Sequence, residues 1–277
     1  MTKKKESKTI YQEVLEKFKQ SSSDKFAAIA TEQFNTFLKE IKNYFSGQMC
    51  PDQHVCKIEN IQNDYFDLEK RKNIFTDGTS TVIENNIPDA ENIFLLILES
   101  PHRDEFYAKD VKDKNGTIIH HKGEPIGPAN GPTGTNIREH IAEIFPDFSN
   151  YHLVLMNAIP FQCSLGVIPE HFRDDVFNVA WNDENIGARF FEKRLKNLLD
   201  KLEKKNVVIV NACTKDNKDN SKKKNGRKNN VTEIIKNLIE SKTVVKKVVK
   251  EVWETPHPSS PSWCSHKGCK RRFPLEN

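Results

Sequence analysis

Apolar residues follow two different patterns along this chain. Up to about residue 46 they recur every three to four positions, as in "KFAAIATEQFNTFLKEIKNYF", which is typical of amphipathic helices. A polar stretch with weak periodicity follows over residues 47–73. We therefore predict an N-terminal helical extension over residues 1–85.

From about residue 90, apolar residues instead form short continuous runs, the mark of strands buried on both faces. The runs are "NIFLLIL" (92–98), "YHLVLMNAIP" (151–160), "NVVIVNAC" (206–213) and one within "VVKKVVKEVWETPHP" (244–258). Helical patterns separate them, at 134–145, 186–204 and 231–241. This alternation predicts an α/β domain over residues 86–277, a three-layer sandwich with a central four-stranded parallel sheet.

One segment breaks the alternation. Residues 214–230, "TKDNKDNSKKKNGRKNN", are polar, rich in lysine and without apolar anchors, which predicts a flexible basic loop. Two interpretations of this loop stay open. It is either a solvated insertion or a source of charges that contact phosphates.

Composition narrows the class of protein. The 277 residues carry a net charge of only +4, which does not by itself indicate nucleic-acid binding. The sequence has no apolar run long enough to span a membrane, and its first residues lack the apolar core of a signal peptide. We expect a cytoplasmic monomer without membrane contact. In that setting its six cysteines are free thiols or metal ligands rather than a disulfide framework.

Polar residues follow the predicted strands, and ligands of α/β sheets bind beyond the carboxyl ends of the strands. After the first strand, Glu99 and Ser100 could orient or deprotonate a water, and His102 could donate a proton. The second strand ends near Asn157, whose amide can read the edge of a base. After the fourth strand, prolines fix the backbone around His257, and the serines that follow offer groups to a phosphate.

Each of these residues also has a purely structural explanation. An asparagine at a strand end commonly caps a turn, a histidine beside prolines is commonly a loop residue, and a carboxylate there is usually solvated. Their joint occurrence at the carboxyl ends of predicted parallel strands favours a site.

Four segments resemble, in order and spacing, the uracil-DNA glycosylase superfamily. In that family a first strand ends in a water-activating motif, and a glycine-rich segment and a helix follow. A second strand then ends in a base-reading asparagine, and a late strand ends in a His-Pro-Ser motif. The matching segments are "LESPHRD" (98–104), "GPANGPTGTNIREHI" (127–141), "LVLMNAIPFQC" (153–163) and "TPHPSSPSW" (255–263). The resemblance covers roughly residues 90–265. It implies DNA as the partner.

The resemblance also implies roles for single residues. Asn157 would hydrogen-bond a flipped pyrimidine, and His257 would stabilise negative charge on the leaving base. Ser259 and Ser260 would grip the DNA backbone. Glu99 lies where the family has a glutamine or a glutamate.

The sequence departs from the family at the first motif. Ser100 takes the place of the aspartate of the best-known branch, so we expect Glu99 to handle the water, with Ser100 as a further water ligand. His102 takes the place of a tyrosine that excludes 5-substituted pyrimidines. A pocket with this wall is expected to accept uracil or a modified pyrimidine, the latter as in an antiviral enzyme that acts on foreign DNA.

The stacking phenylalanine of the family also lacks an obvious counterpart. The small residues Ala129, Asn130 and Gly131 occupy that segment, and Phe161 or Phe106 would stack on the base instead.

Base flipping usually needs a side chain that fills the gap in the duplex, and Trp263 is the candidate. Its structural alternative is a core tryptophan under the C-terminal tail. Phosphate contacts would come from a nearby basic cluster, Lys267, Lys270, Arg271 and Arg272.

Cysteines and histidines gather in two short stretches, one near each end of the chain. They are Cys50, His54 and Cys56, and Cys264, His266 and Cys269. Their spacings, C-x5-C and C-x4-C, match neither zinc nor iron–sulfur motifs well. We expect no cofactor, with a structural zinc or an iron–sulfur cluster on Cys50, Cys56, Cys264 and Cys269 as the weaker alternative.

The sequence therefore predicts a monofunctional DNA glycosylase, since it shows no lysine placed as an obvious Schiff-base nucleophile. One alternative is a module of the same fold that senses a base without cutting it. Another is an unrelated nucleotide or sugar-phosphate hydrolase.

Overall fold

The computed structural model describes residues 48–163, 177–178, 180–214, 227–241, 243–265 and 269–274. The helices predicted over residues 7–46 and most of the basic loop, residues 215–226, lie outside this part.

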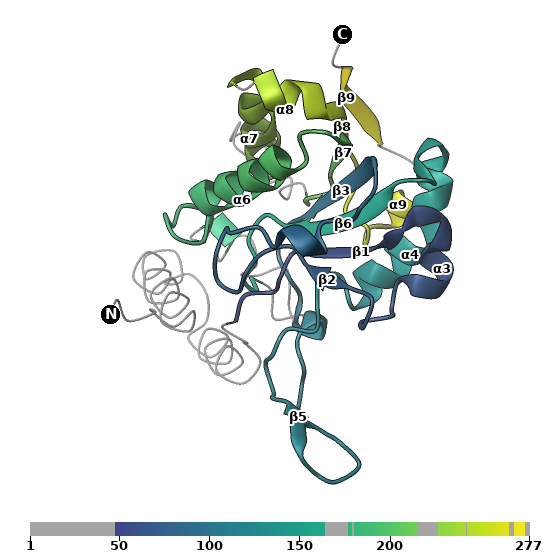
Figure 1. Cartoon of the computed structure of the whole chain (residues 1–277), viewed down its shortest axis with the longest axis vertical. Helices are drawn as coiled ribbons and strands as arrows, with labels where there is room; N and C mark the ends of the chain where they lie inside the picture. The colour runs from purple at the N-terminus through teal and green to yellow at the C-terminus, as the bar shows by residue number, and fades with distance from the viewer. Residues whose placement is uncertain are drawn as a thin grey trace, which may run out of the picture.

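A mostly parallel sheet of seven strands forms the centre of the described chain, in the order β2-β1-β6-β3-β7-β8-β9 (Figure 1). The four central strands are parallel and coincide with the four predicted apolar runs: β6 (His152–Asn157), β3 (Asn92–Leu98), β7 (Asn206–Asn211) and β8 (Val249–Glu254). The α/β class and the parallel core are confirmed. The sheet is wider than the predicted four strands because antiparallel strands extend both of its edges.

The added strands are β1 (Gln53–Lys57), β2 (Lys72–Asn73) and β9 (Lys270–Pro274). β1 pairs with β6, and β2 pairs with β1. Residues 53–57 and 72–73 therefore belong to the sheet, although the prediction assigned them to a helical extension that ends at residue 85. The prediction was wrong there because a short antiparallel strand such as "QHVCK" lacks the long apolar run that marks a central strand.

Alternate residues of the central strands bury opposite faces of the sheet. Ile93, Leu95 and Ile97 of β3 belong to one apolar core, while Phe94, Leu96 and Leu98 belong to another. The first core is covered by α6 (Ala188–Lys201), α7 (Arg227–Ser241) and α8 (Thr243–Val248). The second is covered by α3 (Ile61–Asp64), α4 (Pro132–Ile144) and α9 (Pro261–Cys264). Helices on both faces, visible in Figure 1, are compatible with a three-layer arrangement.

Local sequence explains where α4 begins and ends. Pro132 occupies its first turn, where the N–H that proline lacks would have no partner within the helix. The helix ends before Pro146, because a proline disfavours helical backbone in the residue that precedes it, Phe145. Short 3-10 turns connect other elements: η1 (Ile58–Asn60), η2 (Glu84–Asn86), η3 (Arg103–Glu105) and η4 (Pro146–Phe148). None of the described helices combines the length and the apolar character needed to cross a membrane.

A separate two-stranded hairpin, β4 (Val111–Lys112) and β5 (Ile118–His120), lies outside the main sheet. Figure 1 shows it extending away from the body of the molecule.

Candidate functional site

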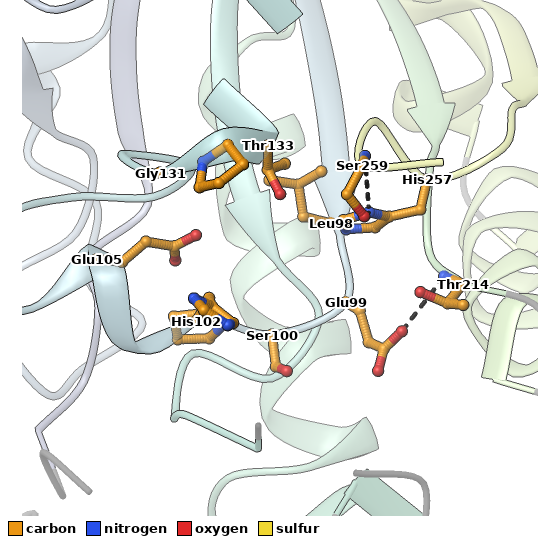
Figure 2. Close-up of a pocket in the computed structure, with 12 residues that line it drawn as sticks. Leu98, Glu99, Ser100, His102, Glu105, Gly131, Thr133, Thr214, His257 and Ser259 are labelled. Atoms are coloured by element: carbon orange, nitrogen blue, oxygen red, sulfur yellow. Dashed lines mark hydrogen bonds between the residues drawn. The ribbon is translucent and has the colours of Figure 1, made fainter. Parts of the chain in front are cut away.

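A pocket of about 250 Å³ lies beyond the carboxyl ends of β3, β7 and β8. Figure 2 shows its lining side chains, which come from four segments far apart in the sequence. They are Leu98 to His102, Glu105, Gly131 to Thr133, Thr214, and His257 with Ser259. The structure thus brings together all four residues predicted to be catalytic, together with the predicted backbone-gripping Ser259.

Glu99 is fixed at this edge by its neighbours. Its carbonyl accepts the N–H of Ile159 at 3.0 Å, which continues the pairing of β3 with the chain after β6. Its side chain, only 3% exposed, accepts the backbone N–H of Thr214 through Oε2 at 3.3 Å. The carboxyl group is therefore held by Thr214, three residues beyond the end of β7.

Asn157 ends β6 next to this pocket. It is paired in register with Leu98, a pocket residue, and strand alternation places both side chains on the α4 face of the sheet. The side chain of Asn157 is fully buried, yet neither its Oδ1 nor its Nδ2 has a hydrogen-bond partner in the described structure. Leaving a buried polar group without a partner costs about 1–3 kcal/mol, which a ligand or a water that reached the amide would offset. Asn157 itself is not among the residues that line the pocket.

A buried ion pair holds the backbone of Asn157. Asp52 accepts the Asn157 N–H at 3.1 Å, and Arg194 donates to the Asn157 carbonyl at 2.7 Å. Asp52 and Arg194 are also bonded to each other, with side chains 1% and 0% exposed. The backbone of Asn157 is thus held by residues from two other segments, neither of which the sequence analysis had linked to the site.

His257 is oriented by the serine two residues later. The backbone N–H of Ser259 donates to Nδ1 of His257 at 3.2 Å, and the Ser259 hydroxyl lies 2.7 Å from the same nitrogen. Because a backbone N–H can only donate, Nδ1 is the acceptor, and the neutral ring carries its proton on Nε2. Figure 2 shows the ring extending toward Leu98. His257 can therefore present an N–H donor to a ligand.

Two further contacts anchor the His257 loop. The Asn136 side chain of α4 donates to the carbonyl of Pro258 at 2.7 Å, and the Lys228 ammonium donates to the carbonyl of Thr255. The loop is thus tied to helices on both faces of the sheet.

Glu105 is a pocket residue that the sequence analysis missed. Its side chain is 4% exposed, and its Oε2 is buried without a hydrogen-bond partner in the described structure. Burial raises the pKa of its carboxyl to about 8. Hydrogen bonds from the backbone of Ala129 and His102 lower this pKa but do not cancel the effect of burial. Glu105 is therefore mostly protonated near neutral pH and can donate a hydrogen bond into the pocket. Its place in the polar run "HRDE" gave no sign of burial.

His102 forms the same wall, as expected. Its Nδ1 lies 3.3 Å from Oδ2 of Asp104 and also accepts the Asp104 N–H at 3.5 Å. Burial lowers the pKa of His102, and the neighbouring Asp104 opposes that shift.

Other predicted contacts do not reach the pocket. Phe161 and Phe106 are 3% and 5% exposed and do not line it, so neither is placed to stack on a ligand there. Trp263 is fully buried and packs near Phe145 in the core, which is the structural alternative and not the wedge. A tryptophan beside prolines looks the same in the sequence in both cases, and only the packing of α9 against α4 decides between them.

Two smaller predictions also change. Asn130 is half-buried beside the pocket but does not line it, whereas its neighbour Gly131 does. The Ser260 hydroxyl accepts the Ser262 N–H at 3.3 Å and so caps α9. The structure gives that hydroxyl a structural role. The side chains of Lys267, Lys270, Arg271 and Arg272 lie outside the described part.

The cysteines that were metal candidates do not form one cluster. Cys50 precedes β1 and Cys56 lies within it, while Cys269 precedes β9, with four strands between β1 and β9. At about 4.8 Å per strand, that separation is on the order of 24 Å. Burial raises the pKa of the Cys56 thiol to about 12, which disfavours the thiolate that a metal needs. Among the described residues no group of three or more His, Cys, Asp or Glu could hold a metal ion.

Comparisons of this chain with protein-family models, with curated proteins and with solved structures find no match.

Proposed function

We propose that this protein is a monofunctional DNA glycosylase that binds a flipped base in the pocket and hydrolyses its N-glycosidic bond. One observation carries the proposal. A buried amide without a partner, Asn157, adjoins a pocket that also holds a carboxyl group, Glu99, and an oriented imidazole, His257. These are a base reader, a water-handling group and an anion stabiliser at one edge of a parallel sheet.

In this mechanism the bond between the sugar C1′ and the base nitrogen breaks, and its electron pair leaves with the base. The Nε2–H of His257 donates to the carbonyl oxygen on which the negative charge gathers. Removing one such donor typically costs about 10²–10³ in rate. A water then adds its oxygen to C1′ and gives its proton to the Glu99 carboxylate, with Ser100 as a second water ligand. The products are an abasic site and the free base.

Recognition of the base rests on two buried groups. The Asn157 amide offers one donor and one acceptor, which suits the edge of a pyrimidine. The protonated carboxyl of Glu105 can donate to a further acceptor on the base. A ligand that satisfied both would remove the cost of leaving them unpaired.

The size and walls of the pocket support a single base with room for a substituent. Its volume of about 250 Å³ is below the range of pockets for drug-sized ligands. The wall beside His102 has no tyrosine and the Gly131 segment has no aromatic side chain, so a 5-substituted pyrimidine meets less hindrance. We infer that uracil or a 5-modified pyrimidine, as in foreign DNA, is the substrate.

The test is to incubate the protein with otherwise identical DNA duplexes and single strands that carry uracil, thymine, cytosine or 5-modified cytosines. Alkali-labile abasic sites are then scored. We expect cleavage at one or more modified or deaminated pyrimidines, and its loss in Asn157→Ala and His257→Ala. If the protein releases uracil but none of the 5-modified bases, the modified-base part of the proposal is wrong.

Two other outcomes separate the alternatives. Tight binding to one base without abasic sites would identify a base-sensing module, which Ser100 in place of a second carboxylate favours. Absence of any DNA binding would overturn the proposed function.

A further inference from the structure

The hairpin that contains β4 and β5, residues 107–124, is an ordered projection that the proposed chemistry does not use. We refer to it as the arm. Its turn is closed by Asp113, whose Oδ1 accepts the N–H groups of Asn115 and Thr117, both at 2.9 Å. Gly116 adopts the positive φ of 83° that this turn needs. The arm is therefore a built element with a defined shape.

The base of the arm is fixed to the pocket wall. The Tyr107 N–H donates to the carbonyl of Glu124, and the Tyr107 carbonyl accepts the N–H of Gly123. The Tyr107 ring stacks on His120 with 4.5 Å between centroids. One step further down, the Ile126 N–H donates to the carbonyl of Glu105, a pocket residue. Whatever occupies the pocket therefore has the arm rising next to it.

The reach of the arm suits a duplex. β4 and β5 contribute two and three residues, which extend about 7–10 Å at 3.3 Å per residue. That length corresponds to about two to three base pairs at 3.4 Å each. DNA whose flipped base filled the pocket would continue along the arm.

The lysines and the carboxylates of the arm differ in their contacts. Its four lysines, Lys109, Lys112, Lys114 and Lys122, are exposed, and none forms an ion pair within the described residues. Its acidic groups have partners in the arm itself. Asp113 caps the turn, Asp110 accepts the Lys122 N–H at 2.8 Å, and Glu124 lies 3.4 Å from His120. The arm thus carries a net charge of +1 (4 − 3), with its lysine ammonium groups exposed and its carboxylates held by contacts within the arm.

Two adjacent isoleucines lie in β5, where alternation along the strand directs one to each face of the arm. Ile118 and Ile119 are 39% and 54% exposed, and only Phe66 and Leu68 are comparably exposed large apolar side chains in the described part. Aliphatic side chains flanked by basic ones suit contact with a minor groove, where apolar residues pack on sugars or wedge between base steps. Trp263, being buried, cannot supply that contact.

We propose that the arm binds the DNA duplex beside the pocket, with its lysines on phosphates and Ile118 and Ile119 in the minor groove. This inference rests on the proposed DNA partner and names the surface that holds it.

The first test is a titration of salt. A labelled duplex of about 20 base pairs is bound by the wild-type protein and by the variant Lys109→Gln/Lys112→Gln/Lys114→Gln/Lys122→Gln. Each phosphate contact contributes about 0.9 to the slope of log affinity against log salt. We expect the variant to lose about 2–4 in slope and at least about 10-fold in affinity at fixed salt.

The matched control removes the same charge from the opposite edge of the sheet. Lys204, Lys246, Lys247 and Lys250 are exposed near the amino ends of β7 and β8. Their replacement by Gln should change the affinity by less than about two-fold if binding lies at the carboxyl edge. Equal effects of the two quadruple variants would overturn the assignment to the arm.

The second test separates apolar from ionic contact. Ile118→Ser/Ile119→Ser should lower duplex affinity by roughly 10-fold without changing the salt slope. Unchanged affinity would refute the minor-groove contact. The wild-type protein is also tested for binding to anionic lipid vesicles and for dimerisation. If the two substitutions abolish either of these while DNA affinity stays intact, the arm is assigned to that other partner.

The outcomes for the arm and for the enzyme are distinguishable. If the wild-type protein binds DNA and all arm variants bind equally well, the arm inference fails and the glycosylase proposal stands. If the wild-type protein does not bind DNA, both fail.

Discussion

Asn136 of α4 and Pro258 of the His257 loop are joined by a hydrogen bond of 2.7 Å, from the Asn136 Nδ2 to the Pro258 carbonyl. These residues lie far apart in the sequence, and the bond ties the helix after the glycine-rich segment to the imidazole that faces the pocket. Asn136 is thus a positioning residue for His257.

Asn136→Ala is expected to slow base release by roughly 10-fold at saturating DNA while leaving DNA affinity within about two-fold, because the bond orients the imidazole and does not touch the ligand. Single-turnover rates and equilibrium binding measure the two effects. Glu139→Ala, an exposed position on the same helix, serves as the control. A loss of affinity equal to the loss of rate would contradict a positioning role.

Asn157→Leu is expected to leave the free energy of unfolding unchanged or to raise it by about 1 kcal/mol, since the buried amide has no partner to lose. The same change should abolish base release. Denaturant unfolding and the abasic-site assay test this pair of outcomes. A destabilisation above about 2 kcal/mol would mean that the amide has a structural partner instead.

Arg194→Met is expected to destabilise the protein by about 3–5 kcal/mol, because it leaves the buried carboxylate of Asp52 without its partner. The backbone of Asn157 also loses a donor at its carbonyl. Denaturant unfolding measures the change. Arg189→Met breaks an ion pair with Glu184 whose side chains are about three-quarters exposed, so it should cost well under about 1 kcal/mol. Similar effects for the two variants would disprove the role of the buried pair.

Glu105 makes stability depend on pH. Its folded-state pKa of about 8 lies above the ordinary value of 4.5, so between these values the folded state binds more protons than the unfolded state. Stability contributed by the neutral carboxyl is therefore present below pH 4.5 and declines as pH rises toward about 8. The slope from this group approaches about 1.4 kcal/mol per pH unit.

Glu105→Gln keeps the shape and removes the titration, so it should flatten the decline between pH 5 and pH 8. Denaturant unfolding at several pH values compares the two proteins. Parallel curves for wild type and variant would exclude Glu105 as the source. Base release by wild type should also fall as pH rises past about 8, because the donor is lost.

Much of the fold could be predicted because it follows from local patterns. The runs "IFLLIL" (93–98) and "VVIV" (207–210) are apolar at every position, which only a strand covered on both faces requires, and both lie in central strands. The start of α4 at Pro132 and its end before Pro146 likewise follow from the local sequence. β1 and β2 could not be found in this way, because each is a short antiparallel strand that forms only by pairing with its neighbours.

The sequence by itself determined which polar residues follow each strand, and the parallel sheet then places Glu99, Ser100, His102 and His257 at one edge, as predicted. Only the tertiary structure decided which polar groups are buried and which aromatic groups are available. Glu105 and the exposed Asp104 are indistinguishable in a polar run, and Trp263 differs from a wedge only by what packs over it. Burial is a property of the whole chain, because the atoms that exclude water from one residue come from segments far away in the sequence.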